Sequence, residues 1–285
     1  MTKKYQNNCP LSVDEPNLSR AWAKAFLHVI DHSGKEISPL ILSVMSFDDN
    51  GAPAEDTAVR QVLDDALKKK GEQDVETVAY TIFPQRLWKM ARGNRARLFE
   101  MYRDVFPRYQ AMNKHNKWGL YFERLISYGR GPCDGNQLEW ILLQYKKSKG
   151  MPQGMRRSMY QASVFDPGRD HRPSIYLTFP CLQSISFVPT KEGLIVNAFY
   201  PTQQLFIKAY GNYLGLAQLG AFMAHEMGLK LLRLNVMVGV AKFDEYPKND
   251  PDFNQLLVAV CACANQRLID EGNIALSKLN DEMIT

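Results

Sequence analysis

Residues 203–228 read QQLFIKAYGNYLGLAQLGAFMAHEMG, a pattern that predicts one long helix. Apolar residues lie around much of the circumference of this helix rather than along one stripe, which is typical of a helix inside a core. Apolar runs rich in branched residues flank it, GLIVNAFY at 193–200 and KLLRLNVMVGVAKF at 230–243, and both read as strands. The stretch therefore predicts a strand, a buried helix and a second strand in succession.

The rest of the chain mixes helical and strand patterns without an internal repeat, a low-complexity segment or a linker. The helical patterns cover residues 17–32, 54–71, 86–94, 96–109 and 135–150, with a terminal helix or helix pair from 251. The remaining strand patterns cover residues 38–47, 75–83, 156–165, 174–180 and 181–188. We expect a single α+β domain over residues 1–285, with a large mixed or antiparallel sheet flanked by helices.

Composition limits the class of protein. The 285 residues are 45% hydrophobic, so the chain can bury a sizeable core and is neither disordered nor fibrous. A net charge of +5 without a basic tail fits an enzyme that binds small anions and argues against nucleic acid as a partner. Five irregularly spaced cysteines argue against a disulfide framework, and no histidines show metal-ligand spacing. Without a signal peptide or a run long enough to span a membrane, we expect a soluble cytoplasmic protein.

One cysteine has unusual surroundings. Residues 179–187 read FPCLQSISF, which places Cys181 directly after a proline in an apolar strand pattern. The thiol is either a small buried hydrophobe or a nucleophile. Arg156 and Arg157 stand side by side in another strand pattern, where at least one of them is expected to meet an anion. Asn212 near the start of the buried helix is either an N-cap or a ligand contact.

The order and spacing of these features resemble the thymidylate synthase family over residues 120–244. That family has a proline–cysteine pair on a central strand, here Pro180 and Cys181, preceded by a strand with paired arginines, here Arg156 and Arg157. It also has a long buried helix that opens with an asparagine, here Asn212. The resemblance implies a thymidylate synthase-like fold and a homodimer.

The resemblance also implies an activity. In the family the thiolate adds to C6 of a pyrimidine, and C5 then attacks a one-carbon unit carried by methylenetetrahydrofolate. Arg156 and Arg157 would lower the pKa of the thiol and hold a phosphate, in the family from across the dimer. Asn212 would contact the base, and Lys242 and Ser186 would contact the substrate. We thus expect methyl or hydroxymethyl transfer to a pyrimidine nucleotide or a related molecule, without a metal.

Several positions depart from the family pattern. Leu182, Pro201 and Gln204 stand where the family has histidine, arginine and aspartate. Lys242 and Asp244 replace its sugar-binding histidine and tyrosine, and its proton-managing glutamate aligns with Gln85. These changes leave a second reading open, a degenerate member that binds a nucleotide without folate-dependent turnover. Asparagine at 212 indicates a uracil-type base, since the cytosine-specific members tend to carry aspartate there.

Overall fold

A seven-strand mixed sheet with helices packed against it forms the centre of the protein. The computed structural model describes residues 10–31, 35–112, 116, 118–149, 156–173, 180–243 and 251–265. The strand order is β1-β3-β7-β6-β5-β4, with β2 also paired to β7. The β1/β3 and β6/β7 pairs are parallel and the other pairs are antiparallel. The strands are β1 Leu11–Glu15, β2 Glu36–Ile37, β3 Leu40–Val44, β4 Gln161–Ser163, β5 Ser184–Pro189, β6 Leu194–Gln204 and β7 Leu231–Lys242. The prediction of a mixed sheet in an α+β fold is confirmed.

Nine labelled α-helices and three short turns connect or cover these strands in the described part of the chain. The helices are α1 Leu18–Asp31, α2 Thr57–Lys69, α3 Val75–Tyr80, α4 Gln85–Ala91, α5 Arg95–Met112, α6 Tyr121–Ile126, α7 Gln137–Ser148, α8 Pro167–Asp170 and α9 Tyr210–Met227. The turns are η2 Cys133–Gly135, η3 Arg157–Met159 and the π-helical η4 Leu205–Ala209. Residues 251–265 form a further helix, as the terminal pattern predicts.

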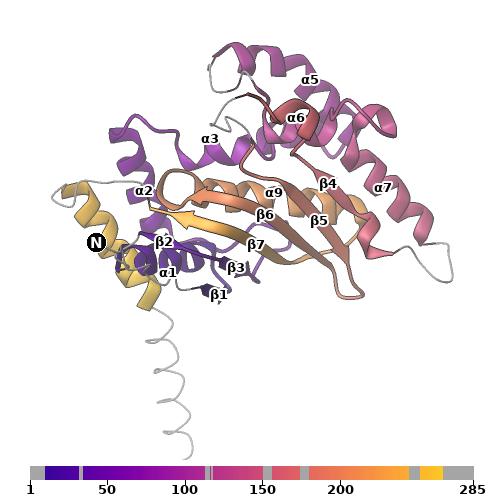
Figure 1. The fold of residues 1–285 in the computed structure, drawn as a ribbon. Coiled ribbons are helices and arrows are strands. Elements are labelled where there is room, and N and C mark those ends of the chain that lie inside the picture. The colour runs from indigo at the N-terminus through magenta and orange to yellow at the C-terminus, as the bar shows by residue number, and fades with distance from the viewer. Residues whose placement is uncertain are drawn as a thin grey trace, which may run out of the picture.

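The long helix predicted from the sequence is confirmed as α9, and nearly all of its residues are buried. It connects β6 to the parallel strand β7, and Figure 1 shows it lying behind these two strands. The side chains of Val196 and Leu231 approach Gly220 of this helix closely. The strand–helix–strand unit is therefore the centre of the core, as its sequence predicts.

The prediction of a strand over residues 75–83 is wrong, because Val75–Tyr80 is helix α3. Asp74 caps the helix by accepting a hydrogen bond from the Thr77 backbone at 2.6 Å. Val75, Val78 and Ala79, at helical spacing, are buried, and the backbone of α3 lies directly against α9. Tertiary packing on glycines of α9 thus outweighs the strand preference of a branched and aromatic sequence.

Two further predictions need correction. Residues 156–165 form turn η3 and only the three-residue strand β4, and Cys181 precedes strand β5, which begins at Ser184. The pattern at 174–179 and the end of the chain from 266 lie outside the described residues.

The face of β6 and β7 that points away from α9 carries an apolar row. Phe199, Met237 and Ile41 are paired across three strands and are 39%, 50% and 38% exposed. Figure 1 shows no helix of the described chain in front of β6 and β7. No helix in the described ranges is both long and apolar enough to cross a membrane.

Beside the apolar row runs a row of polar residues. Ser186, Asn197, Asn235 and Ser43 pair in register across β5, β6, β7 and β3. The Asn235 amide donates to Asn197 at 2.8 Å, and the Ser43 hydroxyl donates to Asn235 at 2.8 Å. These contacts satisfy the polar side chains on a partly exposed sheet face.

Candidate active site

Cys181 lies in a bend that the protein core holds in place. The next residue, Leu182, is fully buried. Gln183 donates from its backbone to Phe199 on β6 at 2.9 Å, and its side chain donates to the carbonyl of Pro180 at 2.9 Å. The bend is therefore fixed on both sides of the cysteine, which makes Cys181 a rigidly placed side chain rather than part of a free loop.

Cys181 opens into a pocket of about 440 Å³ between α3, the end of β6, α9 and the end of β7. Side chains from distant parts of the sequence meet there. The lining residues are Gln73, Val78, Thr81, Asn116, Gly119, Leu120, Tyr121, Cys181, Thr202, Gln203, Gln204, Lys208, Asn212 and Lys242. We call this cavity the Cys181 pocket. It brings together three residues singled out from the sequence, Cys181, Asn212 and Lys242.

The Cys181 thiol is accessible from the pocket and surrounded by protein on its other sides. Burial raises the pKa of this thiol, and the positive charge of Lys208 lowers it. The raised pKa means that the free protein holds Cys181 mainly as a thiol at neutral pH. Reaction as a nucleophile thus depends on whatever positive charge the pocket provides.

Asn212 is buried, with 4% exposure, in the first turn of α9 and lines the pocket. It is not an N-cap, because the π-helical turn η4 leads into the helix and Ala209 occupies the cap position. The alternative of a capping role is therefore wrong. Its amide forms no hydrogen bond with any other described residue, so both a donor and an acceptor are available to a ligand.

Two lysines give the Cys181 pocket its charge. Lys208 stands on turn η4 and donates to the side-chain oxygen of Gln73 at 3.1 Å. Lys242 ends strand β7 and forms an ion pair with Glu36 at 3.2 Å across the edge of the sheet. No aspartate, glutamate or histidine lines this pocket among the described residues. The described part of the pocket wall therefore carries only positive formal charge.

Tyr121 is a site residue that reasoning from the sequence missed. It begins helix α6 and lines the pocket beside Cys181. Burial and the neighbouring Cys181 raise the pKa of Tyr121, while backbone hydrogen bonds from Leu182 and Cys181 lower it. Its hydroxyl stays protonated at neutral pH and can donate a hydrogen bond next to the thiol. The stretch WGLYFERLI gave no signal of this, since an aromatic residue before an apolar run reads as core.

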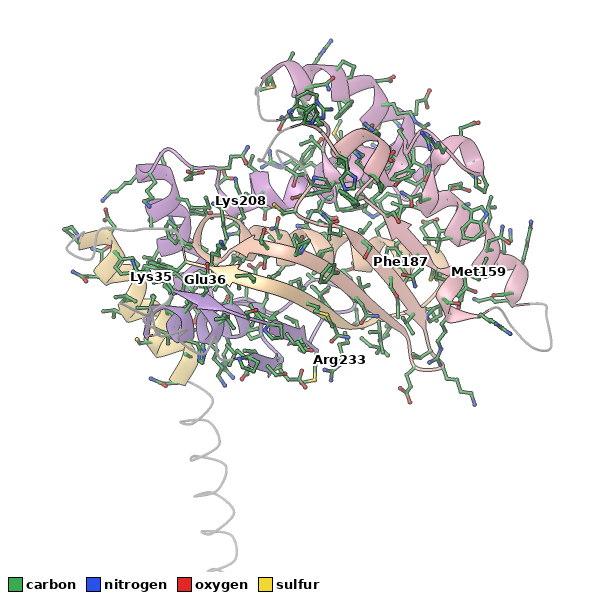
Figure 2. All side chains as sticks on the ribbon, in the orientation of Figure 1. Lys35, Glu36, Met159, Phe187, Lys208 and Arg233 are labelled. Carbon is green, nitrogen blue, oxygen red and sulfur yellow. The ribbon has the colours of Figure 1, made fainter. Side chains whose placement is uncertain are left out.

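The paired arginines and Ser186 do not line the Cys181 pocket. Arg156 and Arg157 are exposed at turn η3. Figure 2 shows Met159 of this turn and Lys208 toward opposite ends of the sheet. Tyr160, directly after the turn, accepts from the Phe187 backbone in the half of β5 farther from Cys181. Ser186 lies on β5 in the polar row, on the opposite side from the buried Ile185 and Phe187.

A second cavity of about 710 Å³ adjoins the Cys181 pocket and shares Gln73, Thr81, Asn116 and Leu120 with it. Its wall includes Tyr80 and Tyr109, whose hydroxyls are hydrogen-bonded at 2.7 Å, together with Leu87 and Met90. We call it the aromatic cavity. Gln85 lines this cavity rather than the Cys181 pocket.

Two carboxylates also line the aromatic cavity, Asp74 and Glu76. Reasoning from the sequence missed both carboxylates, since it assigned residues 75–83 to a strand rather than to helix α3, which borders the cavity. Glu76 is engaged by the Arg60 guanidinium at 3.1 Å. Of the other departures from the family pattern, Gln204 lines the Cys181 pocket, and Asp244 lies outside the described residues.

No group of three or more His, Cys, Asp or Glu side chains in the described ranges is placed to hold a metal ion. The sequence matches no protein-family model, and no curated protein matches it significantly.

Proposed function

We propose that this protein is a thymidylate synthase-like enzyme that modifies a pyrimidine nucleotide, or a related pyrimidine, at C5 through a covalent adduct on Cys181. The observation that carries the proposal is the meeting of Cys181 and the unbonded amide of Asn212 in one pocket beside the buried helix α9. The same order of cysteine, strand, buried helix and strand underlies the sequence resemblance.

The pocket residues fit the first half of that reaction. The thiolate of Cys181 forms a bond to C6, the C5–C6 double bond opens, and its electrons move toward the oxygen on C4. Asn212 offers a donor to that oxygen and an acceptor for the neighbouring ring N–H, the pattern of a uracil-type base. The Tyr121 hydroxyl, beside Cys181, supplies a further donor. The carbon at C5 is then ready to exchange its hydrogen or to accept a one-carbon unit.

Lys242 is the phosphate anchor in this proposal. The position at which the family has a phosphate-binding arginine is Pro201, which carries no charge. The Lys242 ammonium lies on the pocket wall and can bind a phosphate as a point charge, after leaving its exposed pairing with Glu36. Arg156 and Arg157 would complete the anion site only from a second copy of the chain.

A homodimer is accordingly part of the proposal. The row of Phe199, Met237 and Ile41 provides an exposed apolar stripe on a sheet face that no helix of the described residues covers. A twofold interface is self-complementary, so one such face can cover the same face of a second copy. The hydrogen-bonded polar row beside the stripe would favour one register, because a shifted pairing would place Asn197 and Asn235 against apolar groups.

The aromatic cavity fits methylenetetrahydrofolate, which the resemblance implies as one-carbon donor. The cofactor would supply the one-carbon unit. Tyr80, Tyr109 and Leu120 would hold its flat rings, and Gln204 would offer an amide where the family has an acid. Because the Cys181 pocket has no carboxylate or histidine among its described residues, we expect turnover of dUMP with this cofactor to be poor.

That lack of a carboxylate or histidine favours a second candidate function, nucleotide binding without turnover. The two functions differ in one event, the formation of a bond between Cys181 and the base. A binding module would hold the nucleotide through Lys242 and Asn212 and leave the thiol unmodified.

The test is incubation with 5-fluoropyrimidine nucleotides, followed by intact-mass measurement. An adduct of stoichiometric mass is expected with the wild type and with Cys261→Ala, an exposed cysteine in helix 251–265. Cys181→Ala should form none. Tritium release from 5-tritiated nucleotides, without folate, is expected with the wild type and with Cys261→Ala, and not with Cys181→Ala. Binding without adduct or tritium release, across uracil and cytosine nucleotides, would overturn the proposal and support the binding module.

A further inference from the structure

A third cavity, of about 410 Å³, lies between helices α5, α6 and α8 and takes no part in the proposed reaction. It adjoins the Cys181 pocket at Gly119, which lines both. Its described wall contains three arginines, Arg124, Arg169 and Arg172, and one carboxylate, Glu123. We call it the arginine cavity. Ligand sites of this size are usually lined mainly by apolar side chains, so a wall with four charged groups indicates a charged ligand.

Buried polar contacts fix the short helix α8, which forms one wall of the arginine cavity. Asp170 of this helix is buried and binds the buried Arg124 guanidinium at 2.8 Å. The same carboxylate accepts a hydrogen bond from the Asp166 backbone at 2.8 Å, and Asp166 caps the helix. A buried ion pair is a poor source of stability, because both charges lose their hydration. Here it fixes the backbone that carries Arg169 and Arg172, and it offsets the charge of Arg124.

The side chain of Arg172 is oriented by two contacts. Its Nε donates to the carbonyl oxygen of Arg169 at 3.2 Å. Its guanidinium lies over the Trp118 ring, with Cζ 3.3 Å from the ring centroid. No carboxylate of the described residues pairs with Arg172. A guanidinium held by its Nε and by one face keeps its two terminal nitrogens as donors, so Arg172 can bind a planar pair of acceptor oxygens.

Arg169 and Glu123 form only a long contact in this cavity. The Arg169 Nη2 atom lies 3.7 Å from Glu123 Oε1, which is longer than a hydrogen bond. The other oxygen of this carboxyl, Oε2, is buried without a hydrogen-bond partner, and burial raises the pKa of Glu123. A carboxyl with a raised pKa takes up a proton more readily, so it repels a nearby anion less than a fixed charge would. The guanidinium of Arg169 can therefore turn to an anion in the cavity.

We propose that the arginine cavity is a second anion site, which binds the phosphate group of a small molecule through Arg169 and Arg172. Two guanidinium forks three positions apart match the several oxygens of a phosphate, which a single fork cannot satisfy. A volume of about 410 Å³ is larger than a phosphate, so the natural ligand is a phosphorylated small molecule. Lys242 does not line this cavity, and binding here makes or breaks no covalent bond. The inference is thus independent of the chemistry proposed at Cys181.

The test is binding of inorganic phosphate to the full chain, measured by isothermal titration calorimetry in a phosphate-free buffer. Arg169→Gln and Arg172→Gln should each weaken the affinity about tenfold or more, because each removes charge-assisted hydrogen bonds. Arg97→Gln, at an exposed position of α5 outside the cavity, is the matched control and should bind as the wild type does. Lys242→Met, which lacks the phosphate contact proposed for the Cys181 pocket, should keep the site. Glu123→Gln should bind phosphate more tightly, since it removes a negative charge and keeps the shape.

Several results would overturn the inference. The first is an absence of phosphate binding in the wild type, or unchanged binding when Arg169 and Arg172 are both replaced by glutamine. Loss of binding in Glu123→Gln would show that the carboxyl contacts a cation or a donor group instead. Succinate binding as tightly as phosphate would assign the cavity to a carboxylate ligand. Phosphate binding lost in Lys242→Met alone would place the anion in the Cys181 pocket. Adduct formation at Cys181 is a separate measurement, so the proposed function and this inference can fail independently.

Discussion

Replacing Gly215 by alanine tests the packing on which the Cys181 pocket depends. Gly215 lies in α9 where α3 crosses it. A β-carbon added there would stand 2.6 Å from the carbonyl oxygen of Ala79 and 3.0 Å from its α-carbon. Both are backbone atoms of α3, so the clash cannot be relieved by rotating a side chain. The helices have to separate by several tenths of an ångström.

The expected cost follows from two opposing effects. Overpacking of this kind costs about 1–3 kcal/mol. Alanine in place of glycine in a helix interior raises the free energy of unfolding by up to about 1 kcal/mol, because alanine has the higher helix propensity. We therefore expect Gly215→Ala to lower the free energy of unfolding by about 1–2 kcal/mol, which for a chain of this size lowers Tm by roughly 2–8 °C. Because Val78 of α3 and Thr81 at its C-terminal cap line the pocket, adduct formation by Cys181 should also slow.

Gly220→Ala is the matched control in the same helix. A β-carbon at Gly220 would meet the ends of the Leu231 and Val196 side chains at 3.0 and 3.1 Å, and those can rotate away. Thermal and urea unfolding of the two variants would be compared with the wild type. If Gly215→Ala were as stable as the wild type, or Gly220→Ala were the less stable variant, the close approach of α3 and α9 would not have the role given to it here.

Four other predictions follow from single sites. Asp170→Asn removes the nearer carboxylate of the buried Arg124 guanidinium, at 2.8 Å, and leaves Glu123 at 3.9 Å. It should lower the free energy of unfolding in urea by up to about 3–5 kcal/mol, whereas Asp49→Asn at the exposed Lys230 pair should change nothing measurable. Burial raises the pKa of Cys181, so its alkylation rate should rise with pH. The rate should reach half its maximum at a pH above the pKa of free cysteine, and a plateau already at neutral pH would contradict this. Met237→Asp should shift sedimentation from dimer to monomer while Val258→Asp, on the exposed side of helix 251–265, should not. Asn212→Asp should move adduct formation from 5-fluorouracil toward 5-fluorocytosine nucleotides, and equal loss of both would argue against base recognition by this side chain.

The fold was largely predictable where the sequence pattern was long. The helix α9 and its flanking strands combine an extended apolar helix pattern with branched strand residues, and local preference and burial agree there. The strand prediction for residues 75–83 was wrong because the branched and aromatic residues of this segment favour a strand in isolation. Only the glycines of α9, more than 130 positions away in the chain, give a helix a surface on which to pack closely.

The candidate site was predictable in part. Cys181, Asn212 and Lys242, which the resemblance singles out, line one pocket, whereas Arg156, Arg157 and Ser186 do not line it. The role of Tyr121 beside Cys181 had no sequence signal, because its proximity depends on how the bend at Leu182 is anchored. Contacts of this kind join segments separated by about 60 residues, and periodicity carries no information about them.

The amino-acid sequence alone indicates that the chain buries a long apolar helix between two strands, since the run of apolar residues and the composition are local properties. It also determined that a thiol, an amide and several cations are available for chemistry. Which of these groups meet depends on the packing of the whole chain. The bend before β5, the π-helical turn before α9 and the end of β7 converge on one pocket because the parallel β6/β7 pair and the crossing of α3 over α9 place their ends together. Distance between such groups is set by packing of the whole core, so no single segment encodes it.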